Sequence, residues 1–299
     1  MPKNFSEEEH RILNLFAKNK TFDLEGQKYR ILLSGKPTCG KGEPKTDIYV
    51  QAKSKTYNRE LKISFKKANA DFLENKISKE RAIQLFGINW GDVIKKSTSS
   101  IMSSFIDKPL IYKSKLAKTE KGAITLGWKY ELLNVLSGQL SGEVKLTHKQ
   151  LVDVYAGTNL SIDKRNAEVD GNYIKNCGVA NYILVEEKPI KTLQGAINSL
   201  ISIDEYVRKN PKIYFACKAL NYRSFAKKYD GDRPLSVYVD WFINKNNKLD
   251  YKICFDTPLM QGGNFVADKL ILALDELKIK TTDDINNKNV SNPKIIYES

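Results

Sequence analysis

Apolar and polar positions alternate in two short runs of the chain, residues 46–50 and residues 59–65. Both runs are rich in β-branched and aromatic residues, and Lys53-Ser54-Lys55 lies between them. This pattern is typical of two strands joined by a bend. The sequence therefore predicts an antiparallel hairpin with one apolar face that packs on helices. The members of that face are Ile48, Val50, Leu61, Ile63 and Phe65.

The other face of the predicted hairpin carries charged side chains. A bend at Lys53 and Ser54 would place Asp47 opposite Glu60. Opposed side chains have Cβ atoms roughly 5 Å apart, so two carboxylates there could share one divalent ion. Lys62 lies two residues after Glu60 and shares its face. The predicted register thus brings Asp47, Glu60 and Lys62 onto one surface.

The rest of the chain predicts a mixture of helices and strands. A capping box of Ser6 and Glu9 begins a helix over residues 6–20, and Thr147 caps another that extends to residue 155. Further helices are expected over residues 66–76, 79–86, 89–105, 128–136, 193–208 and 264–277. Further strands are expected over residues 29–34, 109–113, 123–126, 182–186, 213–219, 235–244 and 249–255. The polar end, residues 281–299, is expected to be loosely held.

Charge and hydropathy restrict the classes of partner that we expect for this chain. The chain has 299 residues, a formal charge of +14 and a pI near 9.3. An excess of cations favours a polyanionic partner because each neutralised phosphate releases counterions, although the lysine-rich composition also fits an AT-rich genome. No apolar run is long enough to cross a bilayer, and residues 1–7 lack a signal-peptide core. We therefore expect a cytoplasmic, intracellular protein with no membrane partner.

The cysteines and histidines argue against two common kinds of site. Cys39, Cys177, Cys217 and Cys254 are dispersed, and none of them forms a Cys-x-x-Cys pair. The chain has only two histidines, which lie far apart in the sequence. A zinc site and a catalytic triad centred on histidine are therefore both disfavoured.

The residues of the hairpin carry a resemblance to a known family. Asp47 followed by Glu60-Leu61-Lys62 resembles the PD-(D/E)xK nuclease superfamily. The Gly-x-Pro-Lys-Thr-Asp sequence at residues 42–47, followed by Leu-Lys-Ile-Ser, is similar to small type II restriction endonucleases. The resemblance covers residues 42–67, with Thr46 where the family often has Pro. It implies an α/β (α+β) fold with a restriction-endonuclease-like core, in which a mixed central sheet is flanked by helices.

The resemblance also implies a function. Asp47 and Glu60 would hold Mg²⁺, and Lys62 would lie beside the water that attacks a phosphodiester of double-stranded DNA. Residues 1–110 would form the catalytic core, with later elements able to complete its sheet, and residues 111–299 would form an additional α+β region for DNA recognition. Cutting both strands would require a homodimer. The protein would then belong to a restriction system encoded by a bacterium or a phage.

Other charged residues are candidates for supporting roles. Extra metal ligands could come from Glu43 or from the run Glu7, Glu8 and Glu9. Contacts to nucleic acid could come from Lys45, Lys66, Lys67, Arg223 and Arg233. Residues 163–171 form a polar segment that fits a recognition loop or a boundary between domains.

Three alternatives remain open from the sequence. The hairpin could be an ordinary exposed one in a basic, non-catalytic nucleic-acid-binding protein. The nuclease could serve DNA repair or phage DNA processing, and RNA could be its substrate. A nucleotide-binding loop over residues 35–42 is the third alternative, but Lys41 is followed by Gly42 where such loops have Ser or Thr.

Overall fold

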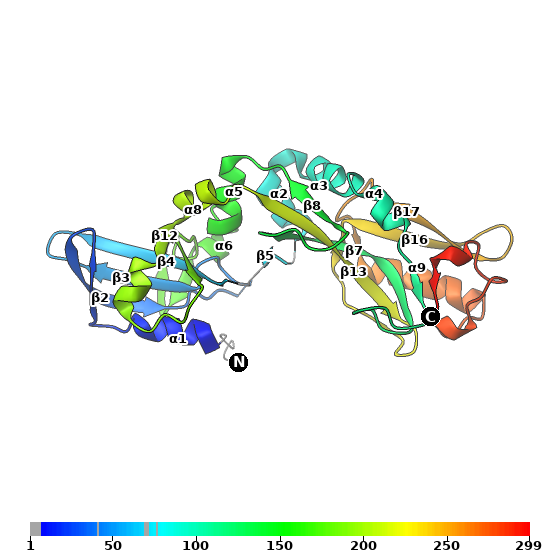
Figure 1. The fold of residues 1–299 in the computed structure, drawn as a ribbon, viewed down its shortest axis with the longest axis horizontal. Helices are drawn as coiled ribbons and strands as arrows, with labels where there is room; N and C mark the ends of the chain where they lie inside the picture. Colours follow the sequence, from blue (N-terminus) through cyan, green and yellow to red (C-terminus); the bar gives the residue numbers. More distant parts are fainter. Residues whose placement is uncertain (1–6, 41, 69–71, 76) are drawn as a thin grey trace. The chain divides into compact units, whose positions relative to one another are not determined.

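The structure is a computed structural model that describes residues 7–40, 42–68, 72–75 and 77–299 (Figure 1). It is a mixed α+β fold with several sheets and helices. The chain forms two compact units, and each unit combines two stretches of sequence. Unit 1 comprises Met1–Asp71 with Leu146–Pro211, and unit 2 comprises Phe72–Lys145 with Lys212–Ser299. The expected single division at residue 110 differs from this arrangement, because the chain leaves unit 1 after its first strands and later returns to it.

Unit 1 is built on a six-stranded sheet in the order β1-β2-β3-β4-β11-β12. The strands are β1 (Thr21–Leu24), β2 (Gln27–Gly35), β3 (Ile48–Lys53), β4 (Asn58–Lys67), β11 (Tyr182–Glu186) and β12 (Leu200–Ser202). A separate two-stranded ribbon consists of β9 (Ala167–Val169) and β10 (Asn172–Ile174). The helices are α1 (Glu7–Leu15), α5 (His148–Ala156), α6 (Ile162–Arg165), α7 (Leu193–Asn198) and α8 (Ile203–Lys209).

The sheet of unit 1 is mixed. Strands β1 to β4 follow one another in antiparallel pairs, whereas β11 lies parallel to β4 with Tyr182 beside Ile63. Pairing with β11 extends β4 to Lys67, so the helix predicted over residues 66–76 is wrong. Strand β11 itself was predicted with the correct bounds, and it completes the sheet from a later part of the chain.

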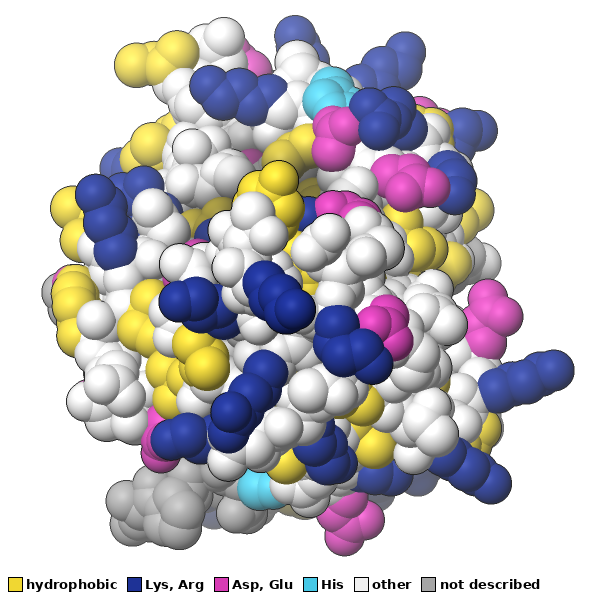
Figure 2. Space-filling view, turned by 90° about the vertical axis from the view of Figure 1, so that its left-hand side faces the viewer, with side chains coloured by type: hydrophobic (Ala, Val, Ile, Leu, Met, Phe, Trp, Pro, Cys, Tyr) yellow, Lys and Arg dark blue, Asp and Glu magenta, His cyan; other side chains and the backbone are white. Residues whose placement is uncertain are grey.

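One face of this sheet forms the core of unit 1, as the alternation of residues predicts. Ile12 and Phe16 of the N-terminal segment and Ala196 and Ile197 of α7 pack there, all almost fully buried. The sheet contributes buried side chains that include the predicted set Ile48, Val50, Leu61, Ile63 and Phe65. The opposite face, which we call the outer face, carries the charged residues of the hairpin. On the side of the molecule shown in Figure 2, Lys and Arg side chains outnumber Asp and Glu.

Unit 2 contains a nine-stranded sheet and several helices. Its strands are β5 (Phe72–Glu74), β6 (Ile111–Tyr112), β7 (Ala123–Leu133), β8 (Ser141–Val144), β13 (Ile213–Arg223), β14 (Lys228–Tyr229), β16 (Val237–Ile243), β17 (Leu249–Cys254) and β19 (Ile296–Tyr297). A small pair joins β15 (Pro234–Leu235) to β18 (Gln261–Gly262). The helices are α2 (Lys79–Phe86), α3 (Trp90–Ser99), α4 (Met102–Ile106) and α9 (Gly263–Glu276), with single 3₁₀ turns η1 (Gly87–Asn89), η2 (Thr282–Asp284) and η3 (Pro293–Ile295).

The long strand β7 differs from the sequence prediction. A strand over residues 123–126 and a helix over residues 128–136 were expected, but one strand runs through Gly127 to Leu133. Gly127 adopts a φ of +152°, and a Cβ there would lie 2.5 Å from the carbonyl oxygen of Val237. The glycine therefore permits β16 to approach closely instead of ending the strand.

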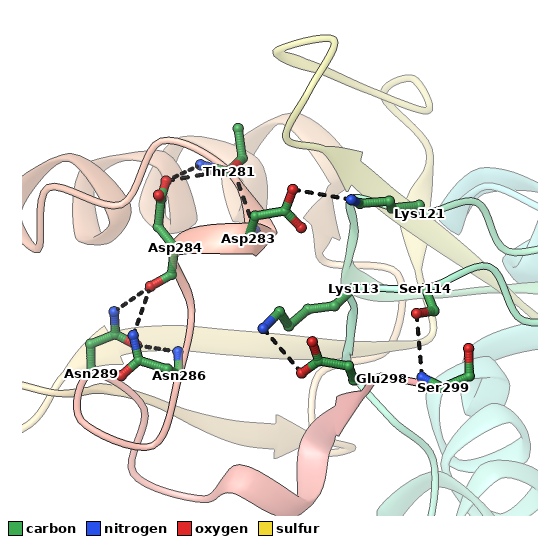
Figure 3. Close-up of polar contacts among 10 residues, drawn as sticks. All are labelled: Lys113, Ser114, Lys121, Thr281, Asp283, Asp284, Asn286, Asn289, Glu298 and Ser299. Carbon is green, nitrogen blue, oxygen red and sulfur yellow. Dashed lines mark hydrogen bonds and ion pairs between the residues drawn. The ribbon is translucent and has the colours of Figure 1, made fainter.

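The C-terminal segment is held against unit 2, which corrects the expectation of a loose end (Figure 3). Strand β19 pairs with β6, and the ammonium of Lys113 lies 3.0 Å from a carboxylate oxygen of Glu298. Lys121 binds Asp283 at 3.1 Å, and Thr281 forms a capping box with Asp284. Ile295 is 3% exposed. Apolar burial and strand pairing thus fix a segment whose composition is polar.

Within the described part of the chain, no helix is long and apolar enough to cross a membrane. Two residues used in the sequence analysis, Ser6 and Lys41, lie outside the described residues. Helix α1 begins at Glu7 and ends at Leu15, five residues before the predicted end.

Candidate active site

The β3–β4 hairpin has a different register from the predicted one. Ile48 pairs with Ile63 and Lys53 pairs with Asn58, so Glu60 lies opposite Gln51. The prediction that Asp47 lies opposite Glu60 is therefore wrong by four positions. The cause is the turn, which spans residues 54–57 and is closed by the backbone N–H of Ser54 donating to the carbonyl oxygen of Tyr57 at 2.8 Å. A shift by an even number of positions leaves each side chain on the same face of the sheet. The face of each residue was therefore predicted correctly, whereas the residues opposite one another were not.

Asp47 lies beside the end of β4 that contains Ser64 and Phe65. Its backbone N–H donates to the carbonyl oxygen of Ile63 at 2.9 Å. Its carboxylate accepts a hydrogen bond from the backbone N–H of Phe65 at 2.7 Å and one from the Ser64 hydroxyl at 3.4 Å. Four positions along a ladder correspond to about 13 Å, which separates Asp47 from Glu60. These two carboxylates cannot share one ion in this arrangement.

Glu60 and Lys62 lie opposite Gln51 and Tyr49 in the ladder. The Tyr49 hydroxyl donates to a carboxylate oxygen of Glu60 at 2.6 Å, and burial together with this carboxylate raises the pKa of Tyr49. The charges of Glu60 and Lys62 both act on the Cys177 thiol, whose pKa is raised chiefly by burial. Cys177 and Tyr49 are packed together under the β9–β10 ribbon. Glu60 and Lys62 therefore lie near the centre of the outer face.

The charges that act on Asp47 come from three other residues. Burial raises the pKa of Asp47 from the ordinary value of 3.8 to about 6. The Lys66 and Lys36 ammonium groups and the hydrogen bond from Phe65 lower the pKa, whereas the carboxylate of Glu9 raises it. Desolvation thus outweighs the two cations. We call Glu9, Lys36, Asp47, Ser64 and Lys66 the Asp47 cluster.

Glu9 reaches this cluster from helix α1. The helix is fixed to the sheet by Ile12, which is fully buried three residues after Glu9. Lys36, directly after β2, donates to a carboxylate oxygen of Glu9 at 3.1 Å and is only 10% exposed. The carboxylate of Glu43 lies at the limit of an ion pair with the same ammonium, at 4.0 Å. The carboxylates of Glu9 and Glu43 therefore both lie beside the Lys36 ammonium.

Gly178 anchors the segment that leads into Asp47. Its carbonyl oxygen accepts hydrogen bonds from the backbone N–H groups of Lys45 and Thr46, at 3.0 and 3.3 Å. Its own N–H donates to the carbonyl oxygen of Arg165 at 2.9 Å. A Cβ at Gly178 would lie 1.9 Å from the carbonyl oxygen of Lys164, so a larger residue cannot take its place without a backbone shift. The position of Asp47 is therefore set by the backbone on both sides.

The other candidates from the sequence lie apart from Asp47 or are already engaged. Glu7 is exposed, while Glu8 forms an ion pair with Lys67 that holds the pKa of Glu8 below its ordinary value. Lys45 is half-buried, and its side chain packs against Gly157. A Cβ at Gly157 would lie 2.7 Å from the Cγ of Lys45.

The two arginine candidates belong to unit 2. Arg223 binds Asp230 at 2.7 Å, and Arg233 is exposed. The loop over residues 35–42 is followed by strand β3 and not by a helix, so it lacks the helix N-terminus that a nucleotide-binding loop uses.

Sequence reasoning assigned no role to Lys36 or Ser64, and it gave Lys66 only a DNA contact. A signal was present, because Ser64-Phe65-Lys66 repeats the spacing of Glu60-Leu61-Lys62 four residues later. Both lysines lie on the outer face of β4. Only the turn decides which of them lies next to Asp47, and the turn was placed incorrectly.

The Asp47 cluster has the donor chemistry of a magnesium site. No group of three or more His, Cys, Asp and Glu side chains suited to a metal occurs among the residues that the structure describes. Magnesium needs fewer protein ligands, since one or two carboxylates with water and substrate phosphate suffice. Asp47 and Glu9 offer two carboxylates whose charges act on each other, and desolvation raises the pKa of Asp47. The residues present therefore fit a divalent ion held together with substrate.

Comparison with known proteins gave no match to a protein-family model, a curated protein or a solved structure. The geometry of the chain itself is therefore the basis for a functional proposal.

Proposed function

We propose that the chain is a Mg²⁺-dependent endonuclease that hydrolyses phosphodiester bonds of double-stranded DNA, most simply a type II restriction enzyme. One observation carries the proposal: Asp47, directly before β3, is hydrogen-bonded to the backbone of Phe65 beside Lys66, and the charges of Lys66 and of Glu9 in helix α1 act on its carboxyl group. The resemblance to PD-(D/E)xK nucleases predicts two acids and a lysine at such a hairpin. In this proposal Asp47 keeps its role, while Glu9 and Lys66 take those first given to Glu60 and Lys62.

Each residue of the cluster has a distinct task. Asp47 and Glu9 would hold Mg²⁺, which when bound neutralises the scissile phosphate and lowers the pKa of a water. Lys66, which forms no ion pair in the described part of the chain, would position the attacking water and stabilise the developing charge. Lys36 holds the Glu9 carboxylate, and the Ser64 hydroxyl and the Phe65 amide hold Asp47.

The fold of unit 1 supports the same proposal. Its mixed sheet combines an antiparallel hairpin with the parallel strand β11, and helices α1 and α7 cover one face. A mixed sheet flanked by helices is the core expected of the superfamily. Since one centre cuts one strand, cutting a duplex at one position would require two copies of the chain.

Cleavage of plasmid and phage DNA tests the proposal. The purified chain is incubated with each DNA in Mg²⁺ and, in parallel, with a chelator, and the ends of the products are sequenced. Discrete fragments in Mg²⁺ alone are expected, and they should disappear in Asp47→Asn. Glu60→Gln is the matched control, because it removes one carboxylate charge from the same face of the hairpin. DNA binding without cleavage by the wild-type chain would favour the alternative of a non-catalytic binding protein.

A further inference from the structure

The β9–β10 ribbon stands on the outer face of the sheet of unit 1. Val169 pairs with Asn172 and Glu168 pairs with Tyr173. Asp170 and Gly171 form the turn with φ values of 48° and 76°, the left-handed conformation that a tight two-residue hairpin requires. Part of the polar segment that the sequence suggested as a recognition loop or a domain boundary is therefore a short, paired hairpin.

The base of the ribbon is fixed to residues that lie before and after Asp47 in the chain. Ala167, Val169 and Cys177 are buried against Tyr49, which lies two residues after Asp47 on the same face. Thr38 and Glu168 exchange two backbone hydrogen bonds, at 2.9 and 3.0 Å. Gly178, four residues after the end of β10, accepts the two hydrogen bonds that hold residues 45 and 46. A contact made by the ribbon would thus lie at a fixed distance from the site of cleavage.

The side of the ribbon that points away from Tyr49 faces solvent. Tyr173 is 72% exposed, and Glu168, Asp170 and Asn172 are exposed around it. Exposed acids disfavour contact with a phosphate backbone, whereas in the major groove Asp and Glu can accept hydrogen bonds from cytosine. A two-stranded ribbon has the width of that groove.

A basic patch lies on the far side of the ribbon from Asp47. Lys53, at the end of β3, shares the outer face with Asp47 and is about 20 Å from it, since six residues of strand separate them. Arg30 lies directly opposite Lys53 in the ladder, and Lys55 lies in the adjoining turn. All three are exposed, and none of them has a carboxylate partner among the described residues. Like charges opposed in a ladder destabilise it, so a polyanion would stabilise this arrangement.

We propose that the ribbon enters the major groove of the DNA while Arg30, Lys53 and Lys55 bind the backbone on its far side. The proposal rests on the proposed function for the identity of the polyanion as duplex DNA. The Asp47 cluster and the basic patch flank the ribbon on one face, as two phosphate contacts flank a groove. Phosphate contacts set the position of the duplex, and the ribbon reads base edges.

The basic patch is tested by binding of a fluorescent 30-base-pair duplex to the full chain in chelator, between 50 and 200 mM salt. Lys53→Gln/Lys55→Gln should weaken binding about tenfold or more and reduce the slope of log affinity against log salt by about 2, because each lost phosphate contact removes about 0.9. Lys149→Gln/Lys191→Gln removes two exposed lysines from helix α5 and the α7 region and should change neither quantity. Equal losses in both double variants would overturn the assignment of the patch.

The ribbon is tested with a second duplex of the same sequence. Its cytosines carry a bulky substituent on C5, which fills the major groove. Binding should weaken at least tenfold against the unmodified duplex, and Tyr173→Ala should reduce that difference. Equal binding of the two duplexes would exclude insertion of the ribbon into the major groove. Tighter binding to anionic vesicles than to DNA would exclude both the groove contact of the ribbon and the DNA contact of the basic patch. These measurements need no cleavage, so a chain that binds as expected but never cuts would contradict the proposed function and leave the DNA surface standing.

Discussion

The carboxylate of Asp47 accepts a hydrogen bond from the backbone N–H of Phe65 at 2.7 Å. This bond joins Asp47 to the residue between Ser64 and Lys66. The charge of Lys66 acts on Asp47, whereas the charge of Lys62 acts on Cys177. A backbone contact thus selects the partner that two similar sequence motifs leave open.

Replacing the two lysines separately tests this selection. Lys66→Met should reduce the rate of DNA cleavage at saturating DNA by at least about 100-fold, because it removes a cation placed at the developing charge. Lys62→Met removes the same charge from the same strand and should change the rate by less than about tenfold. The measurement is a single-turnover cleavage rate in Mg²⁺. If Lys62→Met were the more damaging change, the first assignment of the catalytic lysine would be correct and the one proposed above would fail.

Asp47 should make the stability of unit 1 depend on pH. Its pKa is about 6 in the folded chain and near 3.8 when unperturbed, so the folded state binds the proton more tightly. Stability is therefore greatest when Asp47 is protonated, falls as pH rises from about 4 to about 6, and then stays at the lower level. Asp47→Asn keeps an oxygen that accepts the hydrogen bond from the Phe65 N–H, and it removes the decrease in stability that ionisation of Asp47 causes. At pH 7.5 without metal, the variant should be more stable by between about 1 and 3 kcal/mol.

Urea unfolding at several pH values measures this effect. The advantage of Asp47→Asn should vanish below about pH 4, where Asp47 is protonated in both states. Mg²⁺ should stabilise the wild-type chain at pH 7.5 and have little effect on the variant, because the ion offsets the charge of Asp47. Glu60→Gln should show neither behaviour. A variant that is less stable than wild type at every pH would show that Asp47 serves the fold and not a site.

The alternation of side chains along the hairpin made its two faces predictable from sequence. Side chains alternate along a strand with a period of two, so a shift of the register by an even number of residues leaves Val50 and Leu61 on the same core face. The register itself depends on where the turn closes, and Ser54 closes it through a local hydrogen bond that no pattern of hydrophobicity encodes. Hence Asp47 was correctly placed on the outer face, but the residues predicted to lie beside it were wrong.

Long-range pairing explains the other differences. Lys66 and Lys67 appear at the start of a helical pattern in the sequence, but pairing with β11, over 110 residues later, keeps them in a strand. The contribution of Glu9 could be suspected from its place in an acidic run. The contribution of Lys36 could not, because only the folded chain brings the end of β2 to helix α1. Local patterns predict elements better than the contacts that complete a site.

The C-terminal segment should contribute measurably to unit 2. Deleting residues 293–299 removes the buried Ile295, the pairing of β19 with β6 and the Lys113–Glu298 ion pair. Loss of one buried Ile alone should cost about 2 kcal/mol or more. Hydrogen exchange should therefore rise in β6 and β7 and remain unchanged in β2 and β3. Lys113→Gln, which breaks only the partly exposed ion pair with Glu298, should cost less than about 1 kcal/mol. Equal exchange in the truncated and full chains would mean that the segment adds nothing to unit 2.

Gly127 of strand β7 should not tolerate a larger residue. An alanine there would meet two costs, because its φ of +152° suits glycine and its Cβ would lie 2.5 Å from the carbonyl oxygen of Val237. Strain and overpacking together should reduce the stability of unit 2 by at least about 3 kcal/mol. Gly91→Ala is the matched control, since a Cβ at Gly91 in helix α3 meets nothing within 4 Å and should stabilise the chain by about 0.5–1 kcal/mol. Thermal unfolding of both variants measures the difference, and a Gly127→Ala chain as stable as wild type would show that β16 does not pack against β7 as closely as described.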